Sequence, residues 1–276
     1  NYSTITDYTD ADNIWPNTTL GKYIGETMYA MEQTKNYYNT IHNQSGYDSA
    51  GYDYKVFLNP GFNNNAYYDL GTHAIAFGGN TNGDSAVVSL DIAGHESTHG
   101  MVQFSSNLVY AYQPGALNES FADIFGEMVE RHARGSNDWL IGADIYMGAF
   151  RNMSNPNQYY QPDTYYGTYW STSSFDDGGV HTNSGVQNYW FYLLVNGGSG
   201  TNDNGYSYTV SGIGYTKARI IAYQTMKGLT SNAGYADAKD LSIAITTTIY
   251  GQCSNEVMQV RKAWAAVGVG DPFTPY

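Results

Sequence analysis

Apolar residues follow two kinds of spacing, and the spacing changes near residue 110. Before that point, residues 22–43 carry apolar side chains at helical intervals, and three short apolar runs follow, separated by turns rich in glycine and asparagine. These runs predict strands over 54–58, 65–68 and 74–77, which we expect to form a small antiparallel sheet. Beyond residue 110 the pattern predicts helices over 118–134, 184–196, 212–228, 235–250 and 255–267.

A further helix is predicted over 89–104, between the two regions. Gly94 and Gly100 lower its intrinsic propensity, so we interpret it as a buried helix in which glycine allows close packing. Residues 151–180 form a long loop, and such a loop in a compact domain is usually functional. The chain is therefore expected to be an α+β protein, with a mixed N-terminal lobe over 1–110 that includes this central helix and a helical C-terminal lobe over 111–276. A cleft between two lobes is a common place for a substrate site.

Charge and composition exclude several classes of partner. The chain has 276 residues, a formal net charge of −13 at pH 7 and one cysteine, Cys253. The negative charge argues against nucleic acid and anionic membranes as partners, and no apolar run approaches the roughly 18 residues of a transmembrane helix. One cysteine cannot form an intrachain disulfide, and we interpret it as a small buried apolar group. The chain begins at Asn1 without a signal-like segment, which we take as a mature, processed form.

The pentapeptide from His95 to His99 reads H-E-S-T-H and lies in the predicted central helix. Positions i and i+4 share one face of a helix, so the two imidazoles can converge on one metal ion while Glu96 projects beside it. A catalytic zinc site takes three protein ligands and keeps one position open. Glu119, in a following helix, can supply the third ligand, and Asp123 one turn later can accept a hydrogen bond from a ligand histidine.

H-E-x-x-H followed by N-E-x-x-x-D resembles the thermolysin family of zinc metalloproteases, and further matches extend over residues 10–185. The segment G-G-V-H-T-N-S-G resembles the stretch that carries the family's second catalytic histidine, here His181, and Asp176 matches the aspartate that orients it. Tyr110 matches the tyrosine that stabilises the transition state. The resemblance also places Asn118 beside the zinc ligands, and it implies substrate-binding roles for Asn65, Ala66 and Arg151.

The resemblance implies a secreted, monomeric zinc endopeptidase that acts on peptide and protein substrates after a propeptide is removed. Glu96 would be the general base for a water activated by one zinc ion, and His181 and Tyr110 would stabilise the oxyanion. A hydrophobic primed-side pocket implies cleavage on the amino side of bulky residues such as Leu or Phe. By position, its lining would include Ile92, Ile141, Ile145 and Phe150.

The resemblance further implies at least one structural calcium ion, which prefers oxygen ligands. The family's main calcium site is matched by four carboxylates and one backbone carbonyl, those of Asp91, Glu127, Glu130, Asp138 and Leu140. Leu140 and Ala143 stand where thermolysin has glutamates, so the pattern is closer to single-site members of the pseudolysin and vibriolysin type. Asp10 and Asp12 resemble a further calcium loop. The alternative is ordinary surface charge, although like charges this close are unfavourable without a cation.

Two other classes of protein fit part of the pattern. A catalytically silent relative that binds peptides or matrix proteins would be expected to lack Glu96 or His181, and both are present. A structural zinc domain usually closes its site with four protein ligands, often cysteines, and no fourth ligand is evident. His42, His73 and His132 lack ligand-like neighbours, and we assign them no function.

Overall fold

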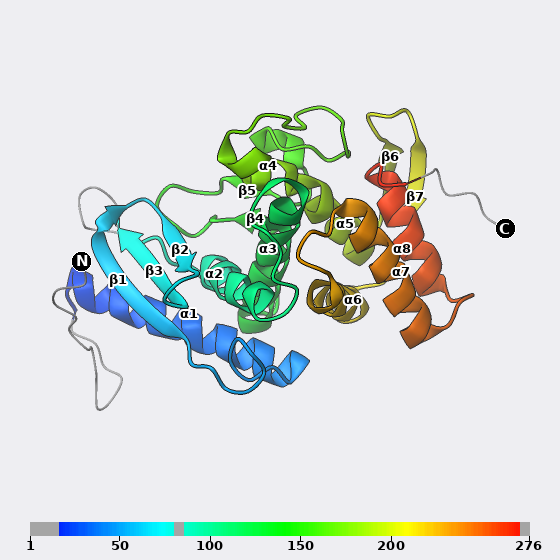
Figure 1. Cartoon of the computed structure of the whole chain (residues 1–276). Helices are drawn as coiled ribbons and strands as arrows, with labels where there is room; N and C mark the ends of the chain where they lie inside the picture. Colours follow the sequence, from blue (N-terminus) through cyan, green and yellow to red (C-terminus); the bar gives the residue numbers. More distant parts are fainter. Residues whose placement is uncertain (1–16, 80–85, 271–276) are drawn as a thin grey trace.

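The computed structural model describes residues 17–79 and 86–270, so the calcium loop expected at Asp10 and Asp12 lies outside the described residues. Two lobes flank a central pair of helices, α2 (Leu90–Gln103) and α3 (Tyr112–Arg134) (Figure 1). The division that we expect at residue 110 falls in the connection between these helices. Among the described residues, no helix is long and apolar enough to cross a membrane.

The N-terminal lobe combines α1 (Thr19–His42) with a three-stranded sheet. The strands β1 (Lys55–Asn63), β2 (Ala66–Asp69) and β3 (Ala74–Gly79) lie in the order β1-β3-β2. β2 and β3 are antiparallel, whereas β1 runs parallel to β3, so the expectation of a purely antiparallel sheet is wrong. The reason is burial: every residue of β3 is buried, and this most apolar strand takes the central position, which separates β1 from β2.

The central helices approach each other through glycine. A Cβ atom on Gly94 would lie 2.9 Å from the Cα of Gly126, and one on Gly126 would lie 2.4 Å from the backbone oxygen of Asp91. Both distances are too short for a real side chain, which confirms the interpretation of the glycine in α2. Helix α3 begins at Tyr112, six residues before the expected start, because Pro114 lies in its first turn, where proline is tolerated.

The C-terminal lobe is mainly helical. The region expected as one loop over 151–180 contains a strand, a 3-10 turn and the start of a helix. The elements after α3 are β4 (Leu140–Ile141), β5 (Arg151–Asn152), η1 (Pro156–Tyr159), α4 (Asp176–Asn183), α5 (Gly185–Asn196), β6 (Gly198–Thr201), β7 (Ser207–Val210), α6 (Tyr215–Gly228), α7 (Tyr235–Tyr250) and α8 (Asn255–Ala266). Trp190 and Trp264 stack in the core with ring centroids 4.6 Å apart.

Cys253 is exposed in the turn between α7 and α8, so its expected burial is wrong.

Candidate active site

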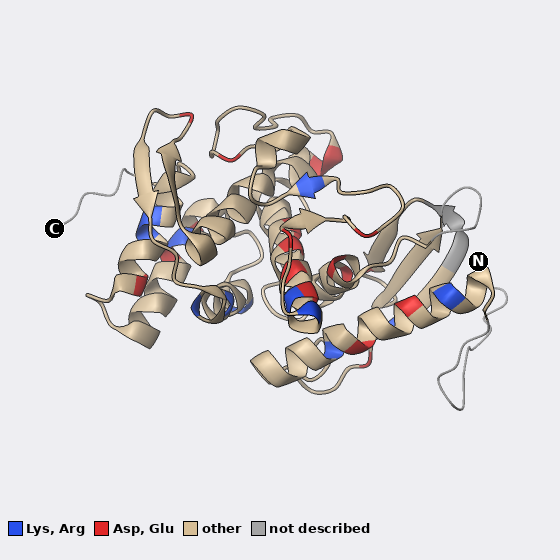
Figure 2. Cartoon of the chain, turned by 180° about the vertical axis from the view of Figure 1, so that it is seen from behind, with Lys and Arg blue, Asp and Glu red and all other residues tan. Residues whose placement is uncertain are grey.

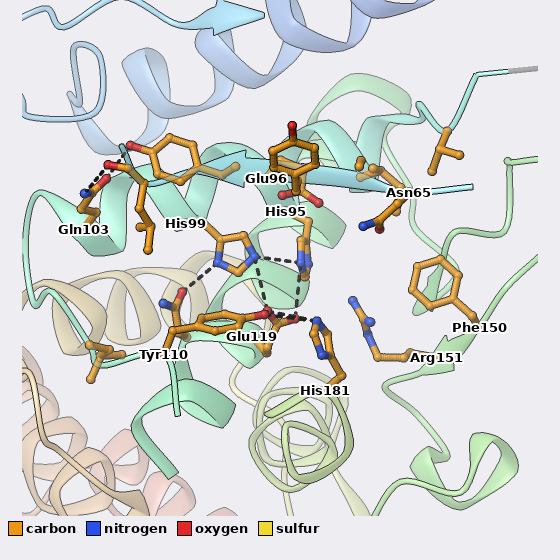
Figure 3. Close-up of a pocket in the computed structure, with 18 of the residues that line it drawn as sticks. Asn65, His95, Glu96, His99, Gln103, Tyr110, Glu119, Phe150, Arg151 and His181 are labelled. Atoms are coloured by element: carbon orange, nitrogen blue, oxygen red, sulfur yellow. Dashed lines mark hydrogen bonds and ion pairs between the residues drawn. The ribbon is translucent and has the colours of Figure 1, made fainter. Parts of the chain in front are cut away.

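Two histidines of α2 and one glutamate of α3 converge at the floor of a cleft (Figure 3). The Nε2 atoms of His95 and His99 lie 3.1 Å apart. Each lies 3.5 Å from a carboxylate oxygen of Glu119, a side chain that is fully buried. The three side chains predicted as zinc ligands therefore offer their ligand atoms to one point.

The hydrogen bonds around these side chains fit a cation at that point. Nδ1 of His95 lies 2.9 Å from Oδ1 of Asp123, and Nδ1 of His99 lies 2.8 Å from Oδ1 of Asn118. Both partner oxygens accept, so each Nδ1 carries a proton and each ring directs its Nε2 towards the same point. The two Nε2 atoms are only 3.1 Å apart, and Oε2 of Glu119 is buried without a hydrogen-bond partner. A cation of the zinc type, which takes imidazole and carboxylate ligands, would satisfy all three groups.

Asp123 also accepts hydrogen bonds from two side chains other than His95. Its Oδ2 accepts hydrogen bonds from Nε of Arg151 and from Nδ2 of Asn188, both at 2.8 Å. Burial opposes ionisation of Asp123, but the guanidinium of Arg151 holds the pKa of that carboxyl well below its usual range. Arg151 lines the cleft, yet its guanidinium is anchored from inside the protein. Asn188 lies on α5, and nothing in its sequence context indicated this contact.

The opposite wall of the cleft carries His181 and Tyr110. Nδ1 of His181 lies 2.6 Å from Oδ1 of Asp176, and its backbone N–H donates to the other oxygen at 3.0 Å. The Tyr110 hydroxyl lies 3.2 Å from Nε2 of His181 and also donates to Glu119. Burial raises the pKa of Glu119, but the nearby histidines and Arg151 outweigh burial and hold it at about 2.

The chain conformation before His181 explains the flanking glycines. Asp176, Asp177, Gly178 and Gly179 all have φ between 48° and 90°, so the first turn of α4 is not α-helical. A Cβ atom on Gly178 would lie 2.3 Å from the ring of Tyr112. Glycine is required there by both conformation and space, and the turn lets Asp176 face the ring of His181.

The cleft has a volume of about 820 Å³, and strand β2 lines one side of it. β2 is an outer strand of the sheet, and the cleft is lined there by Asn65 and Ala66. Glu96, Ile92 and Phe150 also line it. The expected contribution of Ile141 and Ile145 is wrong, because both are buried in the core behind the cleft wall and neither is among its lining residues.

A second cluster of carboxylates lies at the far end of α3. Ligand oxygens of Glu127, Glu130 and Asp138 lie within 4.8 Å of one another. Burial and the neighbouring carboxylates, including that of Asp91, raise the pKa of Glu127 well above its usual value. Asp91 itself accepts a hydrogen bond from the backbone of Gly142 at 2.6 Å. Oε1 of Glu127 is buried without a partner, which fits an oxygen that faces a cation.

Comparison with known proteins identifies the family. Two family models match, "Thermolysin metallopeptidase, catalytic domain" over residues 1–103 and "Thermolysin metallopeptidase, alpha-helical domain" over residues 106–269. Bacillolysin of Bacillus cereus is 37% identical over 269 residues, which are 95% of this chain and 46% of the relative. A thermolysin of Alicyclobacillus acidocaldarius subsp. acidocaldarius is 36% identical over 244 residues, 84% of this chain and 43% of the relative.

The chain thus spans about half the length of these relatives. A solved structure, the precursor of protealysin, a metalloproteinase from Serratia proteamaculans, superimposes with a TM-score of 0.75 at 24% identity. It covers 89% of this chain and 78% of its own, and the likeness confirms the expected α+β fold. Since one family model alone spans more than half of the sequence and the other matches most of the remainder, the chain belongs to the thermolysin family of metallopeptidases.

Proposed function

We propose that this protein is a secreted zinc endopeptidase that cleaves peptide bonds on the amino side of bulky apolar residues. The observation that carries the proposal is the convergence of His95, His99 and Glu119 at the floor of the cleft, with Glu96 beside them. Membership of the family supports the reaction class. We propose by the same resemblance that the protein acts as a monomer after loss of a propeptide.

The chain's own residues divide the work of hydrolysis. When bound, a zinc ion would supply Lewis acidity, which lowers the pKa of a water and polarises a carbonyl. Glu96 takes the proton of the attacking water and delivers it to the leaving amine. Tyr110 and Nε2 of His181 face the same space and donate hydrogen bonds to the developing oxyanion. Asp176 accepts from Nδ1 of His181 and fixes the orientation of that ring.

Substrate would bind as an added strand. In the part of the chain that the structure describes, β2 is an outer strand of the sheet and lines the cleft, and main-chain hydrogen bonds to an extended peptide suit such a strand. Ile92, Met147 and Phe150 supply apolar surface on the same cavity. A large apolar side chain after the cleaved bond suits this lining, because its binding would remove the apolar surface of both the side chain and the cleft from water.

The test is hydrolysis of an internally quenched peptide with a Gly-Leu bond by the wild type and by Glu96→Gln, each with and without 1,10-phenanthroline. We expect cleavage before Leu, loss of activity with the chelator, recovery with zinc, and a rate at least about 10²-fold lower in the variant. The zinc content of Glu96→Gln serves as the control, since Glu96 is not a ligand. If the wild type binds zinc and peptide without cleaving, the silent peptide-binding alternative replaces this proposal.

We also propose that the acidic cluster binds one calcium ion through Asp91, Glu127, Glu130, Asp138 and the carbonyl of Leu140. The buried, unpartnered Oε1 of Glu127 supports it. Calcium should raise the midpoint of thermal unfolding in the wild type and not in Glu127→Gln. An equal shift in both proteins would place the cation elsewhere.

A further inference from the structure

Exposed aromatic residues are frequent in the loop between η1 and α4. We call Tyr160, Tyr166, Tyr169 and Phe175 the aromatic surface; each is between 44% and 83% exposed. The three tyrosine rings have aromatic neighbours: Tyr160 and Tyr169 meet edge to face with centroids 5.5 Å apart, and the ring centroid of Tyr166 lies 4.8 Å from that of Trp170. Because these contacts hold the three tyrosine rings in place, a ligand would meet rings that are already ordered.

The backbone beneath the aromatic surface is unusual. Tyr160, Tyr166 and Tyr169 have φ angles of 58°, 55° and 67°. This left-handed region is unfavourable for a side chain with a Cβ, and glycine or asparagine adopts it more readily. The three rings are at least 44% exposed, so burial in the core contributes little to the choice of tyrosine at these positions. Residues held in unfavourable backbone conformations cluster at functional sites.

The charge of this region is one-sided. Between Arg151 and Lys217 the sequence has no lysine or arginine, whereas it has four aspartates, Asp163, Asp176, Asp177 and Asp203. The loops after β5 accordingly show red segments and no blue ones (Figure 2). Asp203 is exposed, and its Oδ2 accepts a hydrogen bond at 2.6 Å from the backbone of Thr168, between two of the tyrosines. The aromatic surface is therefore also an anionic one.

The position of the aromatic surface relates it to the cleft. Phe175 immediately precedes α4, the helix that carries Asp176 and His181. None of the four aromatic residues is among those that line the cleft. The surface thus lies outside the catalytic cavity, next to the helix that forms one wall of it.

We propose that the aromatic surface binds a segment of the polypeptide substrate that bears arginine or lysine, outside the cleft. Cationic side chains are attracted to the faces of tyrosine rings and to neighbouring carboxylates. Such a second contact would select proteins with a basic segment near the cleaved bond. The inference rests on the proposed endopeptidase function, and it adds a determinant of substrate choice.

The test uses quenched peptides that share one Gly-Leu core. One has no tail, one has a tail of four arginines on a Gly-Ser linker, and one has a tail of four serines on the same linker, with tails placed on either end. We expect the wild type to have an about tenfold lower KM for the arginine tail in one of the two orientations, with unchanged kcat. Tenfold corresponds to about 1.4 kcal/mol.

Two variants separate ring contacts from bulk charge. Tyr160→Asn combined with Tyr166→Asn keeps every charge and suits the left-handed backbone, so the variant should fold and cleave the untailed peptide normally, yet lose most of the preference. Asp203→Asn keeps an acceptor for Thr168 and should lose part of the preference. Glu32→Gln, an exposed charge change on α1, is the control and should lose none.

The outcomes distinguish the two proposals. Equal KM values for the arginine and serine tails in both orientations, or a full preference in the tyrosine variant, would overturn the aromatic docking site while leaving the endopeptidase intact. If no peptide is cleaved, anisotropy of a fluorescein-labelled arginine tail still measures docking. Binding that the tyrosine variant weakens supports the surface, and equal binding by both proteins refutes it.

Discussion

Asp123→Asn tests how the active site is held together. The carboxylate of Asp123 is fully buried, and it accepts hydrogen bonds from three groups: Nδ1 of His95, the guanidinium of Arg151 and the amide of Asn188. Asparagine has the same shape but offers one acceptor oxygen and an NH₂ group. At least one of these partners would then face a donor, and Arg151 would remain buried with its charge uncompensated.

The expected cost follows from the burial of both charges. Breaking a buried ion pair by removing one partner typically costs about 3–5 kcal/mol. For a chain of this size that corresponds to a fall of roughly 10 °C in the midpoint of thermal unfolding. Because Asp123 also orients His95, zinc affinity should fall about 10–100-fold.

Thermal unfolding and a zinc competition titration would be run on the wild type, Asp123→Asn and the double variant Asp123→Asn/Arg151→Met. The double variant removes the uncompensated charge, so much of the lost stability should return while zinc affinity stays low. A single variant within about 1 kcal/mol of the wild type would refute the reasoning. So would a double variant no more stable than the single one.

Three further predictions concern the same helices. Burial and neighbouring carboxylates raise the pKa of Glu130 to about 7. In EGTA, the contribution of Glu130 to the free energy of unfolding should therefore be full below about pH 4.5 and be lost as the pH rises through 7, whereas calcium should abolish that loss. Chemical unfolding at several pH values, with calcium and with EGTA, measures both effects. The pKa of Glu119 is lowered to about 2, so its contribution to the free energy of unfolding should be present above about pH 4.5 and be lost as the pH falls towards 2. Glu119→Gln should therefore weaken the dependence of stability on pH in the acid range, measured in the same way. Gly126→Ala would bring a Cβ to 2.4 Å from the backbone of Asp91, so the free energy of unfolding should fall by about 1–3 kcal/mol. Gly135→Ala is the comparison: its Cβ would meet nothing within 4 Å, so its cost reports only the backbone strain of alanine at φ 79°.

The parts of the site that the sequence predicted are local in the chain. His95 and His99 share a helical face by their spacing, and Asp123 follows Glu119 by one turn, so the helix itself brings them together. The structure brings His95, His99 and Glu119 to one point and places Asp123 behind His95, against its Nδ1. The family resemblance supplied His181, Asp176 and Tyr110, which local spacing alone would not have selected among the chain's other histidines and tyrosines.

What the sequence did not predict depends on contacts between distant segments. Asn188 donates to Asp123 across 65 positions, and no local pattern marks it. Strand order is decided by which strand is buried on both faces, so three short runs could not reveal that β1 runs parallel to β3. Ile141 and Ile145 were assigned to a pocket by position, but apolar residues on a short turn can face either the core or the cleft, and these two face the core.

One stripe of α3 serves both candidate metal sites. The carboxylates of this stripe are spaced by four, four and three residues, which puts them on one helical face: Glu119, Asp123, Glu127 and Glu130. The facing stripe of α2 repeats the pattern with Asp91, His95 and His99. The two sites share no ligand, but they share the pair of helices, whose closest approach is at Gly94 and Gly126. Calcium between Asp91 and the far end of α3 would oppose the mutual repulsion of those carboxylates and so fix the separation of the helices. That separation also sets the distance from His95 to Glu119, so we expect the cation to act on catalysis through helix spacing and not through a direct bond to the zinc site.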